Sequence, residues 1–80
     1  MEIKLIMYNS KKAQIELIEK ISAIREQKSF SQRKLAEISG IKQPAIARLE
    51  SQNAVPRIDT LLKLLAPLGY TLSIVPIETE

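Results

Sequence analysis

Residues 31–51, SQRKLAEISGIKQPAIARLES, carry the pattern that decides the fold of this chain. Ser31 can cap a helix over residues 32–39, because its hydroxyl can accept a hydrogen bond from the first turn. Gly40 can adopt the left-handed conformation that ends such a helix. Apolar residues then resume at helical spacing in residues 43–51, which predict a second helix. The stretch therefore predicts two short helices joined by a tight turn.

The small and apolar residues of this stretch fall where two closely crossing helices must contact each other. Ala36 offers the small side chain that a close crossing needs, and Gly40 permits a tight reversal of the chain. Six residues are expected to hold the two helices together: Leu35, Ala36, Gly40, Ile41, Ile46 and Leu49. This arrangement is typical of a helix-turn-helix, whose second helix enters the major groove of DNA. Ordinary helical bundles can show the same apolar spacing.

Side chains suited to DNA fall on the outward side of the second helix. Glutamine can form two hydrogen bonds with adenine and arginine with guanine, while small apolar groups can touch a thymine methyl. We expect base contacts from Gln43, Pro44, Ala45 and Arg48. We expect phosphate contacts from Gln32, Arg33, Lys42, Asn53 and Arg57. Glu50 is interpreted as structural, paired with Arg57 or a backbone group, since its charge would repel phosphate.

The distribution of charge agrees with this interpretation. The 80-residue chain has a net charge of +3, and residues 25–57 alone hold seven basic and three acidic side chains, a local charge of +4. A basic middle is what a surface facing phosphates requires. A solvated surface of mixed charge would have the same composition, so the charge alone does not decide between these alternatives.

Several residue types that chemistry commonly needs are absent from the sequence. It has no cysteine and no histidine, so thiol nucleophiles, the commonest general base and the commonest zinc ligands are missing. We therefore expect no enzyme activity, no catalytic or metal-ligating residues and no cofactor. No stretch approaches the roughly 20 apolar residues of a membrane span, and the beginning lacks the layout of a secretory signal. These features favour a cytoplasmic protein without a membrane partner.

A longer helix is predicted before the motif. Asn9 or Ser10 can cap it, and it should run to about residue 28. Its apolar residues recur at helical spacing. They are Leu17, Ile18, Ile21 and Ile24. Phe30, in the break that follows, is expected to fill the core beside the next helix.

A leucine-rich helix is predicted after the motif, over about residues 58–66. Pro67 and Gly69 should end it. Its core candidates are Leu61, Leu62, Leu64, Leu65 and Leu68.

The two ends of the chain have different patterns. Residues 1–9 could form a strand, begin a helix or lack order. Residues 71–77 predict a strand, since apolar and polar residues alternate and β-branched ones dominate. One strand needs a partner for its backbone groups. That partner could be residues 3–8 or the same strand of a second protomer, which we favour because it would also dimerise the protein. The dimer contacts are then Leu72, Ile74 and Val75.

The motif and the tail together resemble a known family. SQRKLAEISGIKQPAIARLES resembles the helix-turn-helix of Xre/Cro-type repressors, and PRIDTLLKLLAPLGYTLSIVP resembles the tail of HigA-type antitoxins. The resemblance covers about residues 15–77. It implies a mostly α-helical, lambda-repressor-like domain of four to five helices. That domain would occupy residues 10–70, followed by a dimerisation strand at 71–77 and an acidic tail at 78–80.

The same resemblance implies a function. Members of this group are homodimeric repressors that bind a palindromic operator in their own promoter. They also neutralise a toxin, typically a RelE/HigB-like protein that cleaves mRNA. Two residues depart from the family pattern: Ser39 stands where an apolar residue is common, and Pro44 stands where a polar, base-reading residue is common. Residues 1–9 match nothing in the family and are a candidate toxin-binding part.

Two other functions stay open at this stage. The chain could be a stand-alone or phage-type repressor without a toxin. It could also be a protein-interaction module, with the helices as a scaffold and the tail strand adding to the sheet of a partner. A small, basic RNase-like reading frame beside the gene would favour the antitoxin, while failure to bind any duplex would favour the interaction module.

Overall fold

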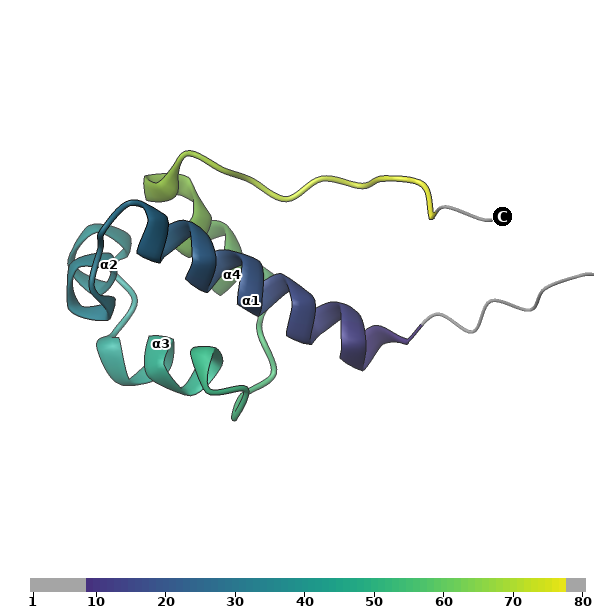
Figure 1. The fold of residues 1–80 in the computed structure, drawn as a ribbon, viewed down its shortest axis with the longest axis horizontal. Helices are drawn as coiled ribbons and strands as arrows, with labels where there is room; N and C mark the ends of the chain where they lie inside the picture. The colour runs from purple at the N-terminus through teal and green to yellow at the C-terminus, as the bar shows by residue number, and fades with distance from the viewer. Residues whose placement is uncertain (1–8, 78–80) are drawn as a thin grey trace, which may run out of the picture.

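The computed structural model describes residues 9–77, and within them the protein is a small bundle of helices (Figure 1). The helices are α1 (Ser10–Gln27), α2 (Gln32–Ser39), α3 (Gln43–Glu50), α4 (Ile58–Leu65) and the 3₁₀ turn η1 (Ala66–Leu68). The predicted, mostly α-helical fold is confirmed, with each helix end within about one residue of its expected place. Residues 1–8 and 78–80, and the predictions that fall on them, lie outside the described part.

The starts of α1 and α2 follow from local capping, as the sequence predicts. The side-chain Oδ1 of Asn9 accepts a hydrogen bond from the backbone N–H of Lys12 at 3.0 Å. The hydroxyl of Ser31 accepts one from the backbone N–H of Lys34 at 2.9 Å. Each cap supplies a partner for one of the N–H groups that a helix start leaves unpaired.

The turn between α2 and α3 depends on two neighbouring residues. Gly40 has φ of 77° and ψ of 4°, the left-handed conformation expected of it. Ser39 accepts a hydrogen bond through Oγ from the backbone N–H of Ile41 at 3.1 Å. The polar side chain at position 39, a departure from the family pattern, therefore supports the turn.

A single apolar core joins all four helices. Leu35 of α2 is fully buried at 0% exposure, and Phe30 packs against the core from its edge, as predicted. Leu62 was expected in the core but is 41% exposed, because it lies on the side of α4 away from the bundle. The buried core residues are Ile18, Ile21, Leu35, Ile46, Leu49, Leu61, Leu64, Leu65 and Leu68.

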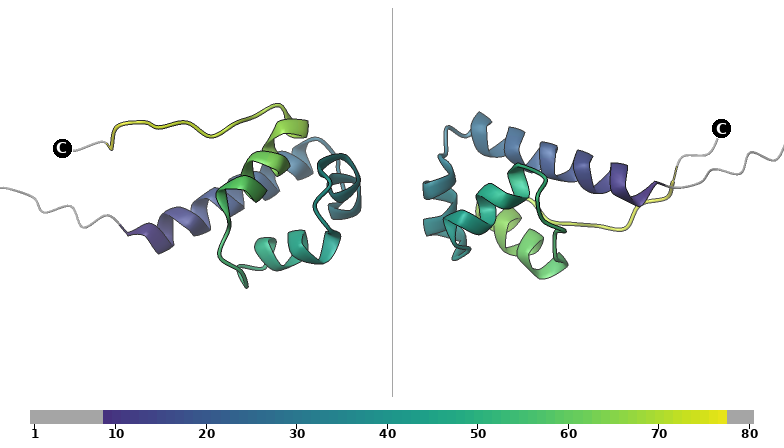
Figure 2. Two further views of the ribbon diagram at one scale, coloured as in Figure 1. Left: turned by 180° about the vertical axis from the view of Figure 1, so that it is seen from behind. Right: turned by 90° about the horizontal axis from the view of Figure 1, so that it is seen from below.

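The helices leave two features outside this bundle. The first turns of α1 extend beyond the other helices, and residues 71–77, here named the arm, run back beside α1 towards that end (Figures 1 and 2). The arm has no strand partner within residues 9–77. Residues 71–77 therefore form no strand within the described part of the chain, and pairing of this segment across a dimer stays a prediction. Leu72 packs partly against the core, whereas Ile74 is 99% exposed.

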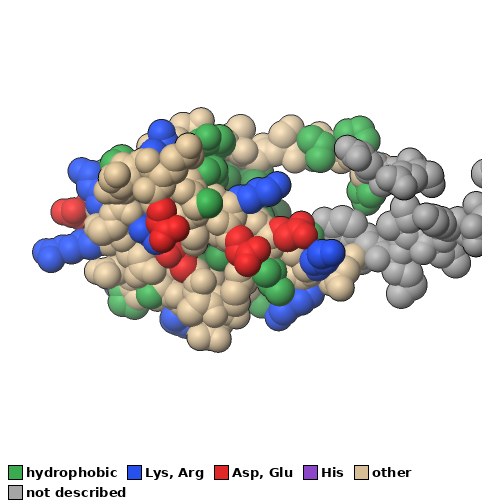
Figure 3. Space-filling view, viewed as in Figure 1, with side chains coloured by type: hydrophobic (Ala, Val, Ile, Leu, Met, Phe, Trp, Pro, Cys, Tyr) green, Lys and Arg blue, Asp and Glu red, His purple; other side chains and the backbone are tan. Residues whose placement is uncertain are grey.

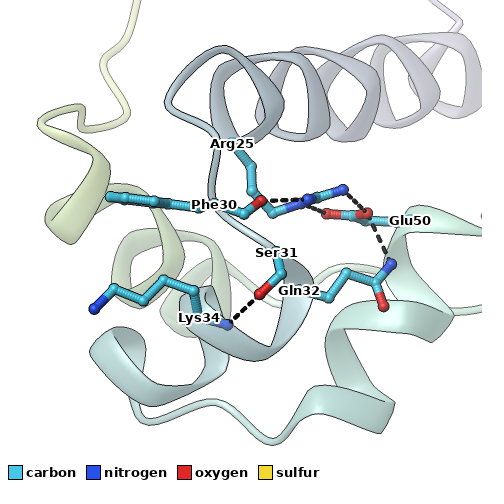
Figure 4. Close-up of polar contacts among 6 residues, drawn as sticks. All are labelled: Arg25, Phe30, Ser31, Gln32, Lys34 and Glu50. Carbon is cyan, nitrogen blue, oxygen red and sulfur yellow. Dashed lines mark hydrogen bonds and ion pairs between the residues drawn. The ribbon is translucent and has the colours of Figure 1, made fainter.

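A buried ion pair joins α1, α2 and α3 at one point (Figure 4). Arg25, near the end of α1, donates from Nε and Nη2 to the two carboxylate oxygens of Glu50 at 2.8 and 2.9 Å. Its Nη1 also donates to the backbone carbonyl of Phe30 at 2.6 Å. Gln32, the first residue of α2, donates from Nε2 to Glu50 at 3.0 Å. These bonds fix the start of α2 and the end of α3 relative to α1.

Glu50 is structural, as predicted, but the predicted partner is wrong. It lies on the inner side of α3, facing Arg25, while Arg57 lies beyond the loop and pairs with Asp59 at 3.1 Å. Burial raises the pKa of the Glu50 carboxyl, but hydrogen bonds from Arg25 and Gln32 and the charge of Arg25 outweigh it. The pKa therefore lies below its ordinary value of 4.5.

Glu50→Gln tests how much this ion pair stabilises the fold. Removing one partner of a buried pair leaves the other charge uncompensated, so we expect a loss of about 3 kcal/mol in the free energy of unfolding near neutral pH. Because the pKa of Glu50 is lower in the folded state, its stabilisation is present above its unfolded pKa and is lost as the pH falls through the folded value. Wild type should therefore lose more stability in acid than the variant in urea titrations.

Glu37→Gln is the matched control, since Glu37 is an exposed carboxylate on α2. It should change the free energy of unfolding by less than about 0.5 kcal/mol. An identical acid dependence for wild type and Glu50→Gln would show that the pair does not stabilise the fold.

Candidate nucleic-acid interface

Helix α3 lies at the side of the bundle with one face on the core and the opposite face open (Figures 1 and 2). Ile46 is 1% exposed and Leu49 is 5% exposed, so these two residues anchor the helix. All four residues predicted to read bases are exposed: Gln43, Pro44, Ala45 and Arg48. The structure thus places them where they could enter a groove of DNA.

The start of α3 limits what Pro44 can do. Lys42 is the N-cap residue, is exposed and makes no side-chain capping bond. Pro44 occupies the first turn, where it has neither a backbone N–H nor a polar side chain. It can offer only an apolar contact, so hydrogen-bonded base contact on this helix depends on Gln43 and Arg48.

The residues predicted to contact phosphates differ in how the fold uses them. Arg33 and Lys42 are exposed on the starts of α2 and α3. Asn53 is exposed in the loop and donates from Nδ2 to the Ser51 hydroxyl at 3.1 Å. Gln32 is half-buried, and one N–H of its side-chain amide donates to Glu50. Only the second amide N–H remains for a phosphate.

Arg57 is held by its neighbour in sequence. Its Nε and Nη2 donate to the carboxylate of Asp59 at 3.1 and 3.5 Å. The Arg57 hydrogen bond is the main reason that the pKa of Asp59 lies below its usual range. Both side chains are well exposed, so the pair is weak and a phosphate can replace the carboxylate.

Two predicted contact residues from different elements meet beside α3. A hollow of about 160 Å³ lies between α3 and the loop of residues 51–57, with Arg48 on one side and Arg57 on the other. Ala45 also lines it, and no acidic side chain does. The hollow therefore brings a base-reading and a phosphate-binding candidate to one place.

The face shown in Figure 3 differs from this surface. Acidic side chains gather across its middle, over α1, while most basic ones lie around the rim. Glu16, Glu19 and Glu26 are the exposed acids of α1. A polyanion would be repelled from this face, which leaves the side of α3 as the better approach.

The described residues lack the features of two other site types. Residues 9–77 contain no group of three or more acidic side chains that could hold a metal ion. None of the described helices is long and apolar enough to cross a membrane. The sequence pattern predicted neither the network of Arg25, Gln32 and Glu50 nor the pair of Arg57 and Asp59.

Comparison with known proteins agrees with this geometry. A helix-turn-helix family model matches residues 21–75. An uncharacterised HTH-type transcriptional regulator of Haemophilus influenzae is 50% identical over 66 residues, which are 82% of this chain and 67% of that protein. The HTH-type transcriptional regulator PuuR of Escherichia coli is 44% identical over 54 residues, 68% of this chain but only 29% of PuuR.

A solved structure is similar over most of the chain. It is described as a toxin–antitoxin module from Streptococcus pneumoniae, with a TM-score of 0.72 and 37% sequence identity over 92% of this chain and 87% of that one. Together with the exposed face of α3, these matches establish the class of the protein. The chain belongs to the Xre-type helix-turn-helix family and is a DNA-binding transcriptional regulator, not an enzyme.

Proposed function

We propose that this regulator is an antitoxin, which neutralises a RelE/HigB-like mRNA-cleaving toxin and represses its own operon as a dimer. The observation that carries the proposal is the likeness, at 37% identity and over nearly the whole chain, to a structure from a toxin–antitoxin module. The likeness extends beyond the helix-turn-helix. A regulator without a toxin would share the helix-turn-helix itself. The description of that structure as a toxin–antitoxin module is what favours the antitoxin over a generic DNA reader.

DNA reading is proposed to depend on the exposed face of α3. Arg48 can make two hydrogen bonds with guanine and Gln43 with adenine, while Ala45 can touch a thymine methyl. Arg33 and Lys42 would bind phosphates and hold α3 in register on the duplex. The buried ion pair of Arg25 supports this arrangement, because it keeps α2 and α3 in one fixed relation.

Dimerisation is proposed to use the arm. Ile74 is 99% exposed and Val75 72% exposed, although both are apolar and the backbone beside them has no strand partner within residues 9–77. Pairing with the same segment of a second protomer would supply those backbone bonds and bury these side chains, each worth about 1.5–3 kcal/mol. The dimer would present two copies of α3 to half-sites about 34 Å apart.

A stand-alone repressor is the second candidate. It is favoured by the two curated relatives, whose names describe transcriptional regulators and mention no toxin. Co-expression with the neighbouring reading frame separates the two functions. For an antitoxin, the two products should co-purify, the growth arrest caused by the neighbour alone should disappear, and the complex should bind the upstream promoter. Promoter binding without co-purification or rescue would establish the stand-alone repressor.

Arg48→Ala tests the base-reading role. We expect a loss of about 1–3 kcal/mol in operator affinity and a relaxed preference at one base position, measured by mobility shift on a panel of single-base operator variants. Arg33→Ala serves as the comparison, because a phosphate contact should weaken binding to all duplexes alike. Unchanged base preference in Arg48→Ala would remove Arg48 from the reading surface.

Ile74→Asp tests the dimer. A charge at this position should prevent burial of the arm, so we expect a monomer in sedimentation velocity and weaker operator binding. Ile58→Asp is the matched control, since Ile58 is also an exposed isoleucine, at 70%, but lies on α4. Ile58→Asp should stay dimeric. The reverse outcome would move the dimer interface from the arm to α4.

A further inference from the structure

A second hollow lies on the other side of the loop of residues 51–57. It has a volume of about 340 Å³ and separates the loop from the first turns of α1. Its polar lining consists of Lys11, Gln14, Gln52 and Asn53, and no acidic side chain lines it. One cation and three amides facing a common space are suited to an anion that accepts several hydrogen bonds.

The fold holds the loop against α1 at this place. Gln52 has φ of 63°, a left-handed conformation that turns the chain sharply after α3. Its Nε2 donates to the backbone carbonyl of Ile15 on α1 at 3.4 Å. The next backbone N–H, that of Asn53, donates to the carbonyl of Arg48 at 2.8 Å. The amide groups therefore reach the hollow from a loop that is tied both to α1 and to α3.

This second hollow adjoins the α3 surface across the loop. Ala54 and Val55 line both it and the hollow between Arg48 and Arg57. Seen from below in the right panel of Figure 2, the loop follows α3 and lies on the side of the bundle from which the first turns of α1 extend. A duplex seated on α3 that reaches across the loop would meet Lys11.

The position of Lys11 on its helix distinguishes it from its neighbours. Lys11, Gln14 and Ile15 are three and four residues apart, so they share the side of α1 that faces the loop. Lys12 is exposed but does not line the hollow. The structure thus offers two adjacent lysines of equal charge, of which one faces the loop.

We propose that Lys11 and Asn53 bind a backbone phosphate of duplex DNA in this hollow, outside the helix-turn-helix. The proposal rests on the DNA-reading function assigned to α3 and extends its footprint onto the first turns of α1. Since a phosphate has the same structure at every step, this contact adds affinity without adding sequence preference.

The test measures how binding depends on salt. Lys11→Ala should lower the slope of log affinity against log salt by about 0.9 and weaken binding about fivefold near physiological salt, alike on operator and unrelated duplexes. Lys12→Ala should keep the slope of wild type, and Lys11→Arg should restore it. Ethylation interference should identify a phosphate that matters to wild type but not to Lys11→Ala.

Two results would overturn the proposal in different ways. If wild type binds duplex DNA but Lys11→Ala has an unchanged slope, or Lys12→Ala loses as much as Lys11→Ala, this contact is absent while the reading function stands. If wild type binds no duplex at any salt concentration, the DNA-reading function fails and the phosphate site fails with it.

Discussion

The surface that we propose for DNA binding depends on the buried hydrogen-bonded ion pair of Arg25 and Glu50. The side chain of Arg25 is 11% exposed and has lost most of its water, and hydrogen bonds to Glu50 and the carbonyl of Phe30 offset this desolvation. Gln32 completes the network from α2. The end of α1, the start of α2 and the end of α3 therefore cannot shift independently. The last two flank the proposed reading surface, and both are held by Glu50 and Arg25.

The helices could be predicted because their ends are decided by local chemistry. Ser31 caps and Gly40 ends α2 through contacts within a few residues, and such contacts are visible in a sequence. The prediction that Leu62 is buried is wrong because Leu62 lies three residues after Asp59 and one before Lys63, on the polar side of α4, which the run of leucines obscures. The Arg25 pair also had a signal: Arg25 continues the buried stripe of Ile18 and Ile21, where an apolar residue is normal. Its partner lies 25 residues away and required the tertiary structure.

The candidate site shows the same division. The helical spacing of Ile46 and Leu49 predicts that they are buried and that the opposite face of α3 is exposed. The structure confirms both. Gln32 was assigned to phosphate from its place at a helix start, yet its amide turns inward to a carboxylate 18 residues away. The sequence does not indicate the position of Lys11, because its relation to the loop depends on how α1 packs against the rest of the bundle, which no local pattern encodes.

The helices α2, α3 and α4 each have only eight residues. Helices of this length are marginal in water on their own, so each persists because the others bury its apolar side. The surface proposed to read DNA therefore cannot fold on its own. It forms and unfolds together with the whole bundle. Such a protein gains or loses its ability to bind DNA in one cooperative folding step. Any ligand that binds only the folded bundle stabilises this ability at the same time.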